Sequence, residues 1–78
     1  MTDDRREEDR KNFVRLANRR VNNVLKYIRL VGNLSNTSNY FYMEEDVQKI
    51  FSVLQAELDD CRQKFDKKKK EKTSFTLE

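Results

Sequence analysis

The stretch VRLANRRVNNVLKYIRLV (residues 14–31) decides the fold of this chain. Apolar residues recur in it at alternating intervals of three and four, at Val14, Ala17, Val21, Val24, Ile28 and Val31. This spacing places about one side chain per turn on the same face of an α-helix. Acidic residues near the start suit the positive end of a helix dipole, and glycine favours the left-handed position just beyond a helix end. We therefore predict a helix over about residues 4–31 that stops at Gly32.

The same spacing returns in the second half of the chain, at Val47, Phe51, Leu54, Leu58, Cys61 and Phe65. Three acids, Glu44–Asp46, stand at its start, and lysines follow its end, as the helix dipole favours. We predict a second helix over about residues 44–66. Met43 is a poor cap for it. The rest is predicted to be a disordered N-terminus (1–3), a loop (32–43) and a basic mobile tail (67–78).

The distribution of apolar residues around each helix predicts how the two assemble. A loop of this length favours an antiparallel two-helix hairpin, so the fold class is all-α. The apolar residues of the second helix fit an arc of about 100°, but those of the first spread over roughly 220°, more than one neighbouring helix covers. We expect two hairpins to form a homodimeric four-helix bundle of coiled-coil type. Its predicted interface contains Leu16, Val21, Val24, Leu25 and Ile28.

Two alternatives to the dimer remain open. The aromatic residues of the loop, with Phe75 and Leu77, could fold over the extra apolar surface of a monomer, or another protein could cover it.

Composition restricts the chemistry that the chain can perform. The 78 residues include no histidine, one cysteine, one glycine and no proline. Catalytic arrangements that need histidine, zinc sites and glycine-rich phosphate loops are therefore not expected, and we predict neither an enzyme nor a cofactor. No apolar run is long enough for a membrane span, and the start is too charged for a secretory signal. With a lone thiol, this predicts a cytoplasmic protein.

A polar stripe on the first helix lies opposite its apolar residues. Arginine and asparagine are residue types that fork onto phosphates and base edges, so the stripe is a candidate nucleic-acid surface. The alternative is a solvated face, or one paired with acids of a neighbour. No third helix or tight turn supports a helix-turn-helix module. The basic stripe consists of Lys11, Arg15, Asn18, Arg19, Asn22, Lys26 and Arg29.

The lysine run at 67–72 could add phosphate contacts to this stripe, or it could only aid solubility.

The loop between the helices is uncharged and aromatic in an otherwise highly charged chain. Tyrosine and asparagine supply rigid contact area and adaptable hydrogen bonds, which is typical of recognition loops. The alternative is that Tyr40 and Phe41 close the open end of the hairpin. The candidate recognition loop contains Asn36, Asn39, Tyr40, Phe41 and Tyr42.

Several segments carry a resemblance to a known group of proteins. RLANRR (15–20), IRLVGNLSN (28–36), Tyr40, Tyr42 and EEDVQKIF (44–51) occur in this order. Over about Phe13–Phe65 the chain resembles short proteins of unassigned function from Gram-positive bacteria and their phages or mobile elements. That pattern has a threonine at the position of Met43, so helix capping differs there. The resemblance implies a bacterial or phage origin and assigns no role to any residue.

Together these features predict a small, non-enzymatic accessory or regulatory protein, plausibly encoded by a phage or mobile element, that docks on a host protein or nucleoprotein. The main alternative is a nucleic-acid-binding protein that uses the basic stripe and the lysine run, and a third is a purely structural oligomer. A membrane partner is not expected.

Overall fold

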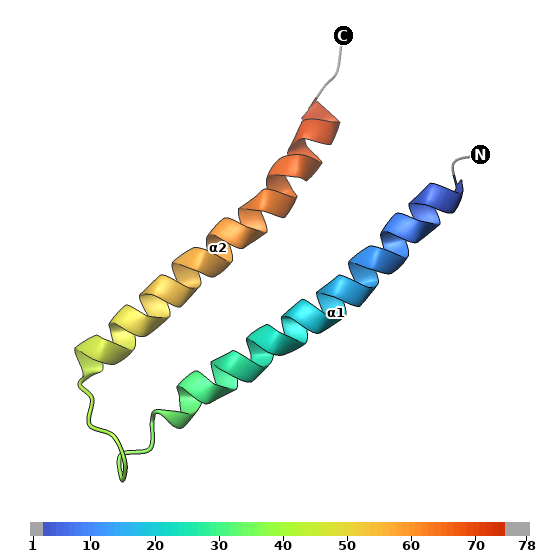
Figure 1. The fold of residues 1–78 in the computed structure, drawn as a ribbon. Coiled ribbons are helices and arrows are strands. Elements are labelled where there is room, and N and C mark those ends of the chain that lie inside the picture. Colours follow the sequence, from blue (N-terminus) through green and yellow to red (C-terminus); the bar gives the residue numbers. More distant parts are fainter. Residues whose placement is uncertain (1–2, 75–78) are drawn as a thin grey trace. The chain divides into compact units, whose positions relative to one another are not determined.

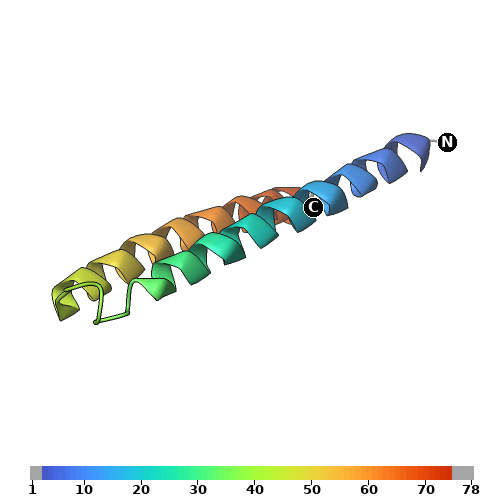
Figure 2. The same cartoon turned by 60° about the horizontal axis from the view of Figure 1, so that its bottom comes forward.

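The computed structural model describes the backbone of residues 3–74 and the side chains of residues 5–67. Over this backbone it contains two α-helices and no strand: α1 (Asp3–Asn33) and α2 (Glu44–Ser74), each unbroken in both views (Figures 1 and 2). The chain divides into two units between Tyr40 and Phe41, with α1 in the first and α2 in the second. The all-α prediction is therefore confirmed. The hairpin and the dimer stay predictions.

Helix α1 is longer at both ends than the sequence predicted. Asp3, expected in a disordered N-terminus, is its first residue, while residues 1–2 lie outside the described part. Gly32 was expected to end the helix in a left-handed conformation, and this was wrong: Gly32 is helical without a positive φ. The helix ends instead in tight turns, in which the amides of Leu34 and Ser35 donate to the carbonyls of Val31 and Gly32 at 3.0 Å. These bonds satisfy terminal carbonyls without a left-handed residue.

Helix α2 begins with a cap that the sequence did not lead us to expect. The Met43 carbonyl accepts hydrogen bonds from the amides of Asp46 (3.0 Å) and Val47 (3.3 Å), which makes Met43 the N-cap. In return, the Met43 amide donates to Asp46 Oδ2 at 2.9 Å. This is one half of a capping box, the half that does not need a hydroxyl at the N-cap. The predicted acidic first turn, Glu44 to Asp46, is confirmed.

The cap gives a first testable prediction. Asp46→Ala removes the acceptor for the Met43 amide and one favourable charge at the helix start, so we expect it to lower the free energy of unfolding by about 0.5–1.5 kcal/mol. Glu45→Ala is the matched control, because it removes an equal charge from the same turn. Urea unfolding followed by circular dichroism measures both. Equal losses for the two variants would show that the hydrogen bond contributes nothing.

Helix α2 also ends later than predicted. It continues to Ser74, so the boundary at residue 66 was wrong and the lysine run 67–72 lies within the helix rather than in a separate tail. The physical reason is that lysine and glutamate are good helix formers and no glycine or proline interrupts the run. Phe75 and Leu77, which could have covered apolar surface in a monomer, lie outside the described residues.

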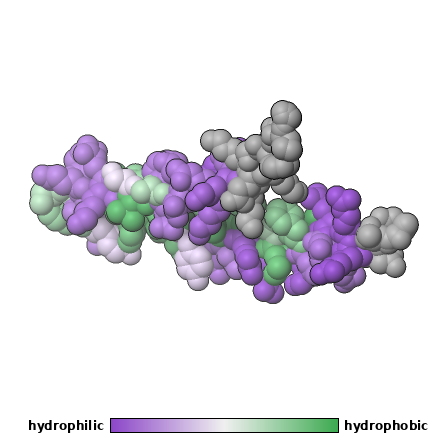
Figure 3. Space-filling view, turned by 90° about the horizontal axis from the view of Figure 1, so that it is seen from above, coloured by the Kyte–Doolittle hydropathy of each residue, from purple (hydrophilic) through white to green (hydrophobic). Residues whose placement is uncertain are grey.

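The described side chains form no core. Within residues 5–67 none is buried; Leu16, Ala17, Val31 and Val47 are half-buried and all the others are exposed. Hydrophobic side chains accordingly reach the surface among hydrophilic ones (green and purple in Figure 3). Each large apolar side chain left in water forgoes roughly 1.5–3 kcal/mol of burial. Most helices in proteins are stabilised by packing of an apolar face, and these faces are exposed on the described helices.

Candidate functional site

The largest uncovered surface of α1 is its apolar face. On a helix with about 100° per residue, its members occupy an arc of roughly 220°, interrupted by Arg20. Val21, Val24 and Ile28, in the middle of the helix, are 50–55% exposed. All five residues predicted for the dimer interface lie on this face, and of these only Leu16 is half-buried. The apolar face consists of Phe13, Val14, Leu16, Ala17, Val21, Val24, Leu25, Tyr27, Ile28, Leu30 and Val31.

Helix α2 carries a narrower apolar seam with the spacing read from the sequence. Phe51, Leu54, Leu58 and Phe65 are all exposed. Cys61 is a free, exposed thiol, so the expectation that it is a small core residue does not hold for the chain as described. The apolar seam of α2 consists of Val47, Ile50, Phe51, Leu54, Leu58, Cys61 and Phe65.

The basic stripe lies on α1 as predicted from the sequence, opposite the apolar face, and all seven of its side chains are exposed. Among the described side chains the one ion pair joins Arg62 Nε to Asp66 Oδ1 at 3.3 Å on α2, so the stripe takes part in none. Arg15 Nη2 donates to the neutral Asn12 Oδ1 at 3.3 Å. The cations of the stripe are therefore not neutralised within the described chain.

The candidate recognition loop is held by bonds centred on Asn36. The amide of Ser38 donates to Asn36 Oδ1 at 3.0 Å, and the amides of Asn39 and Tyr40 donate to the Asn36 carbonyl at 3.1 and 3.0 Å. This is an Asx turn followed by a single helical turn. The Phe41 side chain is 90% exposed, and closure of the end of a hairpin by Tyr40 and Phe41 stays a prediction. Asn36 is thus structural, and Phe41 is the most exposed of the large apolar side chains described.

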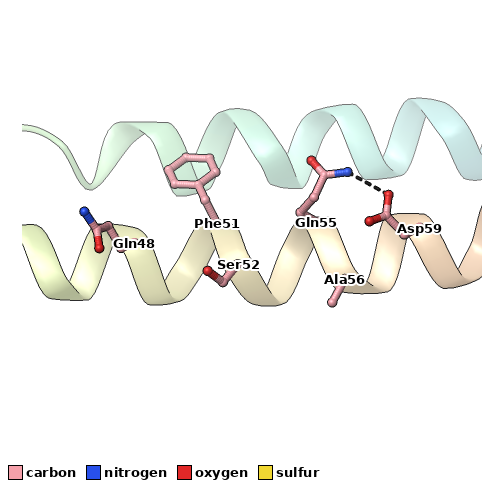
Figure 4. A pocket seen from close by; sticks show the side chains of 6 residues that line it. All are labelled: Gln48, Phe51, Ser52, Gln55, Ala56 and Asp59. Atoms are coloured by element: carbon pink, nitrogen blue, oxygen red, sulfur yellow. Dashed lines mark hydrogen bonds between the residues drawn. The ribbon is translucent and has the colours of Figure 1, made fainter.

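The surface of α2 has a hollow that was not predicted from the sequence. It is open and is lined by Gln48, Phe51, Ser52, Gln55, Ala56 and Asp59, all from one side of the helix (Figure 4). Gln55 Nε2 donates to Asp59 Oδ1 at 2.9 Å across its rim. This bond joins residues four apart on one helix, so the hollow resembles an ordinary helix surface rather than a ligand site. No signal in the sequence could have marked it.

No three histidine, cysteine, aspartate or glutamate side chains converge on a metal site within the described residues. The carboxylates of Glu57, Asp59 and Asp60 stand on the solvated surface of α2, and Asp59 already accepts the bond from Gln55. None of the described helices has an apolar stretch sufficient to traverse a lipid bilayer.

The fold and surfaces define a class: an all-α chain of two helices whose notable features are uncovered surfaces rather than a pocket. Comparison with known proteins adds no family to this description, since no family model, no curated protein and no solved structure matches the chain. The interpretation therefore depends on the residues themselves.

Proposed function

We propose that this chain is a small, non-enzymatic, cytoplasmic binding protein that closes into an antiparallel hairpin and dimerises through α1 into a four-helix bundle. As a bundle it docks on a partner protein of a bacterial host. The observation that supports this is the broad, exposed apolar face of α1 in a chain without a buried side chain among its described residues. A protein whose stability depends on covering such a face is built for association.

The spacing of apolar residues supports the hairpin. In one antiparallel register of α1 and α2, apolar residues of α1 lie opposite apolar residues of α2 in successive layers. The two residue numbers of each such pair have the same sum, as an antiparallel pairing requires. In four of the five layers a larger side chain then lies opposite a smaller one, which suits close packing. This register also places the turn of the hairpin within the segment between Asn33 and Glu44. Its layers pair Val14 with Cys61, Ala17 with Leu58, Val21 with Leu54, Val24 with Phe51, and Ile28 with Val47.

The width of the apolar face supports the dimer. Within one hairpin, α2 would cover the side of α1 that contains Val21 and Ile28, leaving Phe13, Leu16 and Tyr27 uncovered. A symmetric pair of hairpins covers both sides, because every layer of a four-helix bundle receives side chains from all helices. A two-helix hairpin alone buries too little to be comfortably stable. A second copy of the chain is the simplest partner for this surface, because it needs no other protein.

The loop supports docking on a protein. Phe41 is almost fully exposed in an uncharged segment, and buried aromatic anchors commonly carry much of the energy of protein interfaces. The Asn36 turn holds the preceding backbone, which lowers the entropy that binding costs. The resemblance to proteins of Gram-positive bacteria and their mobile elements indicates where such a partner is to be sought.

This docking is tested with tagged protein in nuclease-treated lysate of a Gram-positive bacterium, read by mass spectrometry. We expect Phe41→Ala to lower recovery of a defined protein partner by roughly tenfold or more, as the loss of an aromatic anchor does. Thr37→Ala is the matched control, because it truncates an exposed side chain of the same loop. Equal recovery by both variants, or recovery that disappears with nuclease, would contradict docking through the loop.

A further inference from the structure

The basic stripe has a charge arrangement that costs stability, and it takes part in no ion pair among the described side chains. Lys11, Arg15 and Arg19 follow each other at intervals of four, so like charges face each other along the helix. Such pairs destabilise a helix by a few tenths of a kcal/mol each. Helix α2 shows the opposite arrangement at the same interval, where Arg62 pairs with Asp66. No acidic residue occurs between Arg10 and Val31 to offset the charge. An anionic partner would relieve this repulsion, and the relief would favour binding.

The geometry matches an extended polyanion. With a rise of about 1.5 Å per residue, the cations at 11, 15 and 19 are roughly 6 Å apart, and the stripe from Lys11 to Arg29 is about 27 Å long. It faces away from the apolar face, so it remains accessible in any assembly that covers that face. We propose that the basic stripe of α1 binds duplex DNA, with Lys11, Arg15, Arg19, Lys26 and Arg29 on phosphates and Asn18 and Asn22 between them.

Duplex DNA fits this surface better than other anions do. It carries one charge per roughly 1.7 Å of its axis, and its major groove, about 12 Å wide, admits a helix. The major groove of duplex RNA is too narrow for that. A lipid surface would require apolar residues beside the cations, but all seven members of the stripe are polar and the apolar residues lie on the opposite side of α1. Arginine also offers forked donors to phosphates and base edges, and asparagine offers a donor and an acceptor side by side to a base edge.

This inference goes beyond the proposed function and does not depend on the dimer, because the stripe lies on one helix. Its test is fluorescence anisotropy of a labelled DNA duplex of mixed sequence, titrated with the full chain at several salt concentrations. We expect log K to fall linearly with log salt, with a slope of about 0.9 for each phosphate neutralised. Replacing Arg15, Lys26 and Arg29 with alanine should weaken binding by roughly a hundredfold at low salt. The slope should become shallower by about two to three, because three fewer phosphates are neutralised.

The control variant also loses three positive charges, but from residues outside the basic stripe. Lys49, Arg62 and Lys64 on α2 are exposed and lie outside both the basic stripe and the lysine run, and their replacement by alanine removes the same charge at the loss of one exposed ion pair, Arg62–Asp66. We expect this variant to bind within about threefold of the unaltered chain, with a similar slope. Alanine favours helix, so both variants should keep their circular dichroism.

Equal weakening by the two triple variants would overturn the stripe as the site, and so would binding that does not depend on salt. A parallel titration uses phosphatidylserine vesicles. Tighter binding to vesicles than to DNA would assign the stripe to lipid phosphate and overturn the inference. Dimerisation is measured separately, by sedimentation of the full chain. A chain that fails to dimerise could therefore still bind DNA, and a dimer that fails to bind DNA would leave the proposed function intact.

Discussion

Val21→Glu or Leu25→Glu is expected to give a monomer or an unfolded chain. Both residues lie on the apolar face of α1, and in the proposed bundle their side chains enter the core. An unpaired carboxylate buried in a core costs several kcal/mol, about 3–5 in typical cases. Since each 1.4 kcal/mol is a factor of ten, the dimer dissociation constant should rise by a hundredfold to a thousandfold or more.

The control for this prediction is Asn22→Glu, which introduces the same charge beside Val21 but on the basic stripe, where the side chain is exposed. We expect it to remain a helical dimer. Size-exclusion chromatography and circular dichroism distinguish the outcomes. A folded dimer carrying glutamate at position 21 or 25 would show that the interface lies elsewhere.

Val14→Cys is expected to form an intramolecular disulfide with Cys61 under oxidising conditions. In the proposed register these two residues occupy the same core layer of the hairpin, and Cys61 is the only cysteine of the chain. A disulfide that closes a loop of this length should raise the free energy of unfolding by roughly 4 kcal/mol if it fits without strain. Non-reducing electrophoresis with mass spectrometry detects the bond, and urea unfolding measures its effect.

Two further variants make this prediction decisive. Val14→Cys with Cys61→Ser removes the partner thiol and should unfold like the unaltered chain. Val21→Cys places the new thiol one heptad further along α1, where a hairpin shifted by one heptad would bring it opposite Cys61. Ready oxidation of Val21→Cys but not of Val14→Cys would contradict the register. Bonds formed only between chains would contradict the closed hairpin itself.

The sequence predicted the two helices well because their signal is periodic. Apolar residues at alternating intervals of three and four identify a helix whatever surrounds it, and α1 and α2 both contain the predicted segments. The acidic first turn of α2 was predictable for the same local reason. The position of the basic stripe also followed, since a helix fixes which residues share a side.

The helix ends were not predictable from residue preferences alone. Gly32 often ends a helix, but here the tight turns after Val31 satisfy the carbonyls, so the left-handed conformation is not needed. The lysines after Asp66 suit a helix end and a helix interior equally well. Asp46 could have been recognised as a capping residue from its position three beyond Met43, but Met43 lacks the hydroxyl that usually draws attention to this motif.

Burial is the property that the helices by themselves leave undecided. Periodicity marks Cys61 and the neighbouring seam residues as core positions, yet Cys61 is exposed and no described side chain is buried. Periodicity shows which side chains share a face, but not what covers that face. In the proposed bundle the cover comes from a second helix and a second copy.

The most direct test of this account is sedimentation equilibrium of the full chain over a wide concentration range, with helicity measured at each concentration. We predict a mass of twice the 9.5 kDa chain at high concentration, and a loss of helical signal as dilution separates the copies. A particle with the mass of one chain that keeps its full helicity at every concentration would contradict assembly through α1.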